Sequence, residues 1–237
     1  IGRQTLSKLQ YYGVHTPLEL ADKSESWVRA RLALPGLQTW RELNGVACID
    51  TSEAVRRKTI CTSRSFGEMV GDLPSLKAAV ATFAGSCANK LRGEASGARS
   101  VTVWVCSNRF RDDLPQYCGA ESAALPVPTS DTMEITQAAL DALGRVFRQG
   151  ILYKRAGVMV GDITAIAPCQ ADLFDPVRNR AQRARLMKSV DALNHRYGLK
   201  TLRLAVEGGD RQPWKLKCAH RSPCYLTRLD EILTIHT

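Results

Sequence analysis

The chain has 237 residues, enough for one or two domains with a sizeable hydrophobic core. With 44% hydrophobic, 24% charged and 6% aromatic residues its composition excludes disorder throughout, and no apolar run reaches the roughly 18 residues that a membrane-spanning helix needs. The 33 Lys and Arg residues exceed the 23 Asp and Glu residues by ten, which favours a polyanionic partner, nucleic acid before acidic lipid.

Residues 1–45 carry the pattern of short helices. An apolar stripe at helical spacing ends at Gly13, a candidate left-handed C-cap, and Thr16 with Pro17 supplies an N-cap and a first-turn proline for a second helix. The apolar residues that follow predict one or two further short helices. Residues 46–57 show no period and end in basic residues, so we expect an extended basic linker.

The next 109 residues, 58–166, are predicted to form a domain of β-α-β-β-α-β order. Strands are expected over 58–67, 100–106, 117–125 and 153–163, and the two helices are expected to begin at Asp72 and at Thr129, Ser130 or Asp131. Such an order gives a four-stranded antiparallel sheet with both helices on one face, an α+β fold. The other face is then free for a partner.

The last quarter of the chain carries most of the basic excess. From Pro176 to Thr237 there are 13 Lys and Arg residues and 5 Asp and Glu residues, an excess of eight. An Arg-rich helix is predicted over 178–197, and residues 199–237 contain short strand-like pieces around a polar cluster at Trp214.

The eight cysteines are widely spaced and form no CxxC pair. We expect reduced, buried thiols and no metal site, because Cys218, His220 and Cys224 have no second ligand pair at zinc-finger spacing. The chain shows no signal-peptide pattern. It opens with Ile1 and not with Met, so we expect an N-terminal part to be missing.

Five motifs in a fixed order carry a resemblance to a known family. They are Ile1-Gly2-Arg3 with Lys8-Leu9, Arg64-Ser65-Phe66-Gly67, Ala156-Gly157-Val158-Met159, Gln170-Ala171-Asp172-Leu173-Phe174, and Trp214 with Ser222-Pro223 and Tyr225. In this order they resemble the thumb, the first and last strands of the little finger, the clamp-binding pentapeptide and the C-terminal extension of UmuC-type Y-family translesion DNA polymerases. The resemblance covers essentially the whole chain.

The resemblance implies a division of the chain and a function. It implies a thumb-like helix-hairpin-helix at 1–45, a basic linker at 46–57, a little finger at 58–166, a clamp-binding peptide at 167–176 and a basic UmuC-type extension at 177–237. The expected function is to bind primed or damaged duplex DNA and to tether an error-prone polymerase to the bacterial sliding clamp during SOS repair and mutagenesis. The processed UmuD dimer and RecA are further expected partners, in the bacterial cytoplasm at the nucleoid.

The same resemblance places catalysis outside this chain. Family members hold two Mg²⁺ ions with carboxylates of the palm, which would precede residue 1. The adjacent carboxylate pairs here, Asp112-Asp113 and Asp230-Glu231, lack the apolar strand context of a metal site. We therefore expect no enzymatic activity, cofactor or metal in this chain, and Mg²⁺ only in a polymerase that includes the palm.

Two sets of binding residues are predicted. The DNA-binding set is Gly2, Arg3, Lys8, Arg56, Arg57, Lys58, Arg64, Ser65, Arg109, Arg111, Lys154 and Arg155. The clamp-binding set is Gln170, Asp172, Leu173 and Phe174. Because the DNA contacts would go to phosphates, we expect binding that tolerates sequence and weakens with salt.

Two other functions fit part of the pattern. An RNA-binding protein is one alternative, since the RNA-recognition fold shares the β-α-β-β-α-β order, although the inner strand at 100–106 offers only Trp104 for base stacking. A protein-interaction adaptor with an incidental basic surface is the other.

Overall fold

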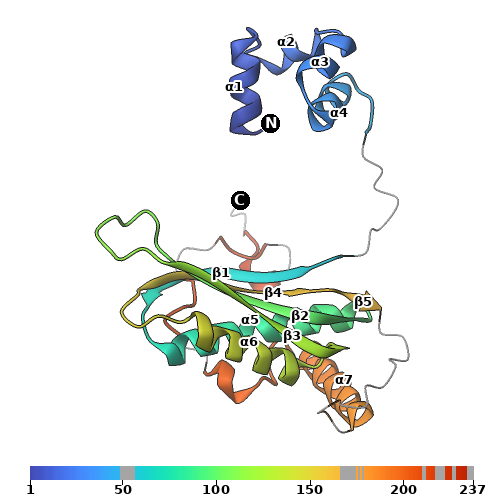
Figure 1. The fold of residues 1–237 in the computed structure, drawn as a ribbon. Helices are drawn as coiled ribbons and strands as arrows, with labels where there is room; N and C mark the ends of the chain where they lie inside the picture. Colours follow the sequence, from blue (N-terminus) through green and yellow to red (C-terminus); the bar gives the residue numbers. More distant parts are fainter. Residues whose placement is uncertain are drawn as a thin grey trace. The chain divides into compact units, whose positions relative to one another are not determined.

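A computed structural model describes residues 1–48, 57–165, 175, 177, 179–209, 212–216, 222–225 and 228–233. The chain forms two compact units, Ile1–Arg56 and Arg57–Thr237 (Figure 1). Each unit has its own hydrophobic core. None of the helices in the described ranges combines the length and the apolar character needed to cross a membrane.

The first unit consists of short helices, as predicted. They are α1 (Arg3–Tyr11), α2 (Pro17–Ala21), α3 (Glu25–Arg31) and α4 (Leu34–Leu43). The chain leaves α1 through Gly13, whose φ of +69° lies in the left-handed region that glycine tolerates. The Thr16 hydroxyl accepts a hydrogen bond from the Glu19 amide, and Pro17 is the first residue of α2, so both caps are confirmed.

The second unit has the predicted β-α-β-β-α-β order. Its elements are β1 (Ile60–Val70), α5 (Leu73–Gly93), β2 (Ser96–Ser107), β3 (Cys118–Thr129), α6 (Thr132–Val146), β4 (Tyr153–Gly161), β5 (Thr164–Ala165) and α7 (Arg180–Tyr197). The strands pair in the order β1-β4-β2-β3, all antiparallel, and β5 adds a two-residue pairing to β2. The α+β class is confirmed, and the sheet has five strands where four were predicted.

Both helices of this domain pack on one face of the sheet (Figure 1). Asp72 caps α5 by accepting a 2.7 Å hydrogen bond from the Ser75 amide, and Asp131 caps α6 through the amides of Met133 and Glu134. Alternate residues of the strands, such as Val103 of β2, are fully buried beneath the two helices.

Helix α7 is attached to the sheet domain largely through ion pairs. Met187 is the one fully buried residue of this helix, and its other large apolar side chains, such as Leu186 and Leu193, remain substantially exposed. The ion pairs are Arg92–Asp191 (2.6 Å), Arg180–Glu134 (3.1 Å) and Arg183–Asp131 (2.7 Å). All of these side chains are at least half buried, so the pairs are screened from solvent more than ordinary surface pairs are.

The segment after α7 differs from its prediction. The described residues between 199 and 233 contain two short 3₁₀ helices, Ala205–Glu207 and Leu229–Glu231, and no strand, so the expected strand-like pieces are wrong there. Gly208, Gly209 and Pro213 interrupt the alternation that a strand needs. Instead Trp214 packs edge to face on Phe83 of α5, at 5.6 Å between ring centroids, and joins the domain core.

The prediction of reduced, buried cysteines is wrong for most of the described thiols. Cys106 and Cys118 occupy directly opposed positions on β2 and β3 and are joined by a disulfide. Cys61 and Cys224 are exposed. Cys87 is buried in the core, where burial raises the pKa of its thiol. Sequence spacing gave no sign of the disulfide, because strand register alone brings its two cysteines together.

Candidate nucleic-acid interface

The sheet face opposite α5 and α6 is called the outer face. One residue in two along each strand points away from the helices and lies on this face, and most of these side chains are small. The residues are Cys61, Ser63, Ser65, Thr102, Trp104, Cys106, Cys118, Ala120, Ser122, Arg155, Gly157 and Met159. The outer face therefore has little relief, and Trp104, Arg155 and Met159 are its only long side chains.

Trp104 lies flat across the outer face because its neighbour on β4 is a glycine. Gly157 pairs with Trp104, and a Cβ at Gly157 would come within 2.5 Å of the indole ring. Arg155 stacks on the indole, with its guanidinium carbon 4.9 Å from the ring centroid. The pair thus forms a layered, cationic platform at one end of the outer face.

A hollow of about 540 Å³ adjoins this platform, between the sheet and the tip of the β2–β3 hairpin. Its lining residues are Ser65, Trp104, Cys106, Ser107, Asn108, Arg109, Phe110, Gln116, Tyr117, Cys118, Lys154 and Arg155. Three of these are cations and none is a carboxylate, so the hollow has a positive electrostatic potential.

The three cations of the hollow are held by neutral groups. Lys154 donates a 2.6 Å hydrogen bond from Nζ to the Phe66 carbonyl, and Arg109 lies 4.9 Å from the centroid of the Phe110 ring. Arg155 stacks on Trp104 as described. No carboxylate in the described part of the chain forms a salt bridge with any of the three, so their charge is available to an anion.

The hairpin tip that carries Arg109 is an ordered structure. The Gln116 side-chain amide donates hydrogen bonds to the carbonyls of Asn108, Arg111 and Leu114 at 2.8 to 3.1 Å, and its oxygen accepts one from Ser107. One side chain therefore ties together most of the tip. Sequence reasoning missed Gln116 and Phe110, since neither is charged and no motif includes them.

The structure brings together four of the predicted DNA-binding residues and separates others from them. Ser65, Arg109, Lys154 and Arg155 all line the hollow. By strand alternation Arg64 lies on the face that α5 covers, because its neighbours Ile60, Thr62 and Phe66 on that face are buried. Arg111 is paired bidentately with Asp113, at 2.6 and 2.7 Å, and Arg57 is paired with Glu94 at 3.1 Å. Lys58 is exposed just before β1 begins.

The remaining predicted residues lie elsewhere in the chain. Gly2 is the N-cap of α1, Arg3 is its first residue and Lys8 belongs to its last turn, all in the first unit. Gly2 and Lys8 are thus at opposite ends of α1. Arg56, Gln170, Asp172, Leu173 and Phe174 lie outside the described residues.

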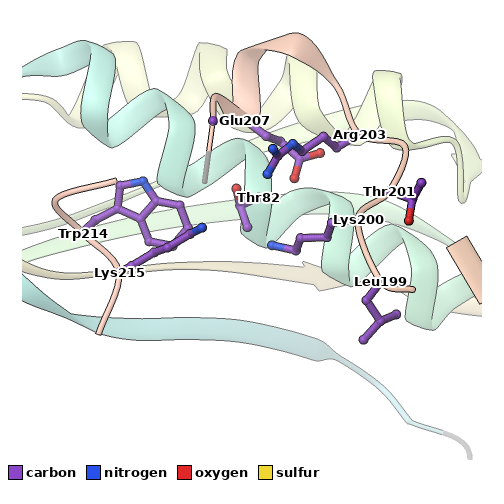
Figure 2. A pocket seen from close by; sticks show the side chains of 9 residues that line it. Thr82, Leu199, Lys200, Thr201, Arg203, Glu207, Trp214 and Lys215 are labelled. Carbon is purple, nitrogen blue, oxygen red and sulfur yellow. The ribbon is translucent and has the colours of Figure 1, made fainter. Parts of the chain in front are cut away.

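A second basic pocket, of about 520 Å³, lies on the α5 side of the sheet (Figure 2). Its side chains come from α5 and from residues 199–215, and they include Lys200, Arg203 and Lys215. Burial lowers the pKa of Lys200, and the neighbouring cations add to this effect. The Glu207 carboxylate lines the same pocket and acts on the Lys200 pKa in the opposite direction. Because of this negative charge, the pocket suits a polyanion less well than the hollow does.

Neither predicted carboxylate pair has the surroundings of a metal site. The Arg111 guanidinium holds the pKa of Asp113 below its usual range. Glu231 accepts a hydrogen bond from the Cys224 amide and pairs with Arg228. The described residues contain no group of three or more His, Cys, Asp or Glu side chains that could hold a metal ion.

Comparison with known proteins shows similarity to one protein family along most of the chain. Residues 57–173 match the impB/mucB/samB family C-terminal domain, and residues 184–235 match a domain of unknown function, DUF4113. The chain is 36% identical to protein UmuC of Salmonella typhimurium strain LT2 over 236 residues, which is 99% of this chain and 56% of that protein. It is 36% identical to protein ImpB of Salmonella typhimurium, over 98% of this chain and 54% of that protein.

A third relative, protein MucB of Escherichia coli, is 34% identical over 228 residues, which is 96% of this chain and 53% of that protein. The chain thus spans little more than half the length of the curated relatives it matches. The hollow and the outer face lie within the segment that matches the family domain. The chain belongs to the impB/mucB/samB family, the UmuC-type group of the Y-family DNA polymerases.

Proposed function

We propose that the outer face and its hollow bind the DNA backbone, as the DNA-holding part of an error-prone translesion polymerase. The observation that carries this proposal is the group of three cations, Arg109, Lys154 and Arg155, around a hollow whose described lining includes no carboxylate. Phosphate is the anion that DNA presents in a regular array, and cations without counter-charges release bound counterions when they meet it.

The character of the outer face supports binding that does not read sequence. Its small Ser, Thr, Ala and Gly side chains cannot reach deeply into a groove to contact base edges. Contacts would go to phosphates and sugars, which position a protein without identifying bases. A polymerase that copies damaged templates needs this tolerance.

The RNA-binding alternative has less support. The central strands of the sheet are β4 and β2, and the outer face of these two strands carries a single aromatic residue, Trp104. RNA-recognition sheets stack two or three bases on exposed aromatic side chains, which these strands lack.

The test is the affinity of the chain for a primed duplex as a function of salt, measured by fluorescence anisotropy. We expect log K to fall steeply with log salt, by about 0.9 for each phosphate contact. The variant R109A/K154A/R155A should bind more weakly and reduce the salt slope by up to about 3. The control R185A/K188A/R196A removes the same charge from exposed positions of α7.

The matched control separates a local site from a general charge effect. If both triple variants lost affinity and slope equally, binding would depend on net charge alone and the hollow would not be the site. An affinity that does not change with salt would contradict the whole electrostatic proposal.

Tethering to the sliding clamp is the second part of the proposed function. Its support is the resemblance of Gln170–Phe174 to a clamp-binding peptide, in a segment outside the described residues. A short tether raises the effective concentration near DNA to about millimolar, so weak contacts suffice. L173A/F174A should abolish binding to a bacterial clamp and leave clamp-free DNA binding and Tm unchanged. A large loss of Tm would show that these residues belong to a core.

The activity of a longer protein is also a proposal. We place nucleotidyl transfer with Mg²⁺ in a palm that this chain does not contain, and contacts with a processed UmuD dimer and RecA in that larger assembly. The chain alone should extend no primer in the presence of Mg²⁺ and deoxynucleotides. Template-directed extension by the purified chain would contradict this assignment.

A further inference from the structure

The tip of the β2–β3 hairpin presents an aromatic ring to solvent beside the hollow. Phe110 is 79% exposed, the largest exposure among the described phenylalanines and tryptophans. Loose structure does not explain this exposure, because the Gln116 amide ties the backbone around Phe110 through three hydrogen bonds. The backbone on either side of this exposed apolar ring is therefore held by hydrogen bonds.

The groups around this ring are those that bind a nucleotide. Arg109 lies against Phe110, Arg155 lies on Trp104, and both pairs line the same hollow. Aromatic rings next to cations are how proteins hold single-stranded nucleic acid, since a base stacks on the ring while the backbone phosphate meets the cation. A volume of about 540 Å³ is within the range of small-ligand sites.

We propose that the hollow receives an unpaired nucleotide of single-stranded DNA, with its base stacked on Phe110 and its phosphate beside Arg109 and Arg155. This inference rests on the proposed DNA-binding function and adds a preference for DNA with a single-stranded part over duplex alone. A duplex alone offers no base that could stack on Phe110, because its paired bases are stacked on each other. A junction between duplex and single strand would occupy both the outer face and the hollow.

The experiment compares three DNA probes with the intact 237-residue chain. They are a blunt duplex, the same duplex with a short single-stranded overhang, and that overhang with abasic sites in place of its nucleotides. We expect the overhang to bind about tenfold more tightly than the blunt duplex, in line with one base–aromatic stack, and the abasic overhang to lose most of this gain. A 2-aminopurine in the overhang should be quenched on binding.

The variant F110A should remove the advantage of the overhang and the quenching, so that it binds overhanging and blunt DNA with equal affinity. F110W should retain both. The matched control is Y197A, which removes another exposed ring with a stacked arginine, since Arg196 lies 5.2 Å from the Tyr197 centroid on α7. Y197A should behave as wild type.

The outcomes distinguish this inference from the function on which it rests. If blunt and overhanging DNA bind equally, or if F110A keeps the overhang preference, the hollow is not a nucleotide site although the chain still binds DNA. If no probe binds, the proposed DNA-binding function itself fails. Tighter binding of single-stranded RNA than of the matching DNA would also overturn the assignment to DNA.

Discussion

At the scale of single residues, Asp131 performs two tasks that connect separate parts of the sheet domain. It is 8% exposed, caps α6 through two backbone amides, and accepts hydrogen bonds from the Arg183 guanidinium at 2.7 and 3.0 Å. The cap neutralises the positive end of α6, and the pair attaches α7. A helix start thus serves as the anchor for a second helix.

Removing the Asp131 carboxylate should lower the free energy of unfolding, and the contributions of the cap and of the ion pair can be measured separately. We expect D131A to lower the free energy of unfolding by about 2 to 4 kcal/mol, because the cap and a half-buried ion pair are both lost. D131N keeps a capping oxygen and should lose about 1 kcal/mol less. Urea denaturation of these variants with and without R183M measures the coupling. Equal losses in D131A and D131N would show that the cap contributes nothing.

Asp175 should titrate at unusually low pH. The hydrogen bond from the Arg180 side chain, with one from the Val177 amide, lowers the pKa of Asp175 from 3.8 to about 2. Because the pKa of Asp175 is lower in the folded chain than in the unfolded chain, its ionised carboxylate contributes its full stabilisation at pH values above 3.8. This contribution is lost as the pH falls from 3.8 toward about 2. The carboxyl carbon shift in NMR should report the titration, and R180Q should return the pKa toward 3.8. A wild-type midpoint near 3.8 would refute the pairing.

At the scale of elements, the segment after α7 joins the domain core through Trp214, the one core residue among its described residues. Trp214 is 6% exposed and packs on Phe83, whereas the nearby Leu216 is 56% exposed. The basic C-terminal segment is thus fastened to α5, on the side of the sheet that the hollow does not use.

The variant W214A should therefore lower the free energy of unfolding by about 3 to 5 kcal/mol, as expected for the loss of a buried tryptophan. L216A should change it by less than about 0.5 kcal/mol. Because the buried Trp214 indole N–H has no hydrogen-bond partner among the described residues, W214F should cost much less than W214A. Chemical denaturation monitored by circular dichroism tests all three. Similar losses in W214A and L216A would contradict this anchoring.

The helices and strands could largely be predicted from the sequence, whereas the register in which the strands pair could not. Alternation at Val101, Val103 and Val105 and the carboxylate caps are local signals, so the strands and helix starts follow from them. A shift of one residue in strand pairing moves every side chain to the other face. For this reason the opposite faces of Arg64 and Arg155, and the pairing of Cys106 with Cys118, required the structure.

At the scale of the whole molecule, the chain is divided into two units with separate cores. The predicted DNA-binding residues of α1 belong to one unit, and the hollow belongs to the other. If both sets of residues contact phosphates as proposed, two modest contacts within one chain give a tighter total affinity than either contact alone.

Independent cores predict independent unfolding. We expect calorimetry of the intact chain to show two transitions, and a chain of residues 57–237 to reproduce the larger one. This shorter chain should keep the salt-dependent binding that involves the hollow, with a smaller slope than the intact chain. A single cooperative transition, together with an unfolded shorter chain, would show that the two units depend on each other.

Gly157, the glycine beneath Trp104, affects the shape of the outer face and therefore how DNA would move along it. Since Gly157 lets the indole lie flat, the outer face lacks a ridge that would interlock with the grooves of a duplex. Under the proposed function, a duplex bound to this smooth face would be able to advance by one base pair without leaving the protein. Resistance to movement would then come from the hollow and its cations, so that the sheet supports the passing DNA while the hairpin tip sets where it pauses.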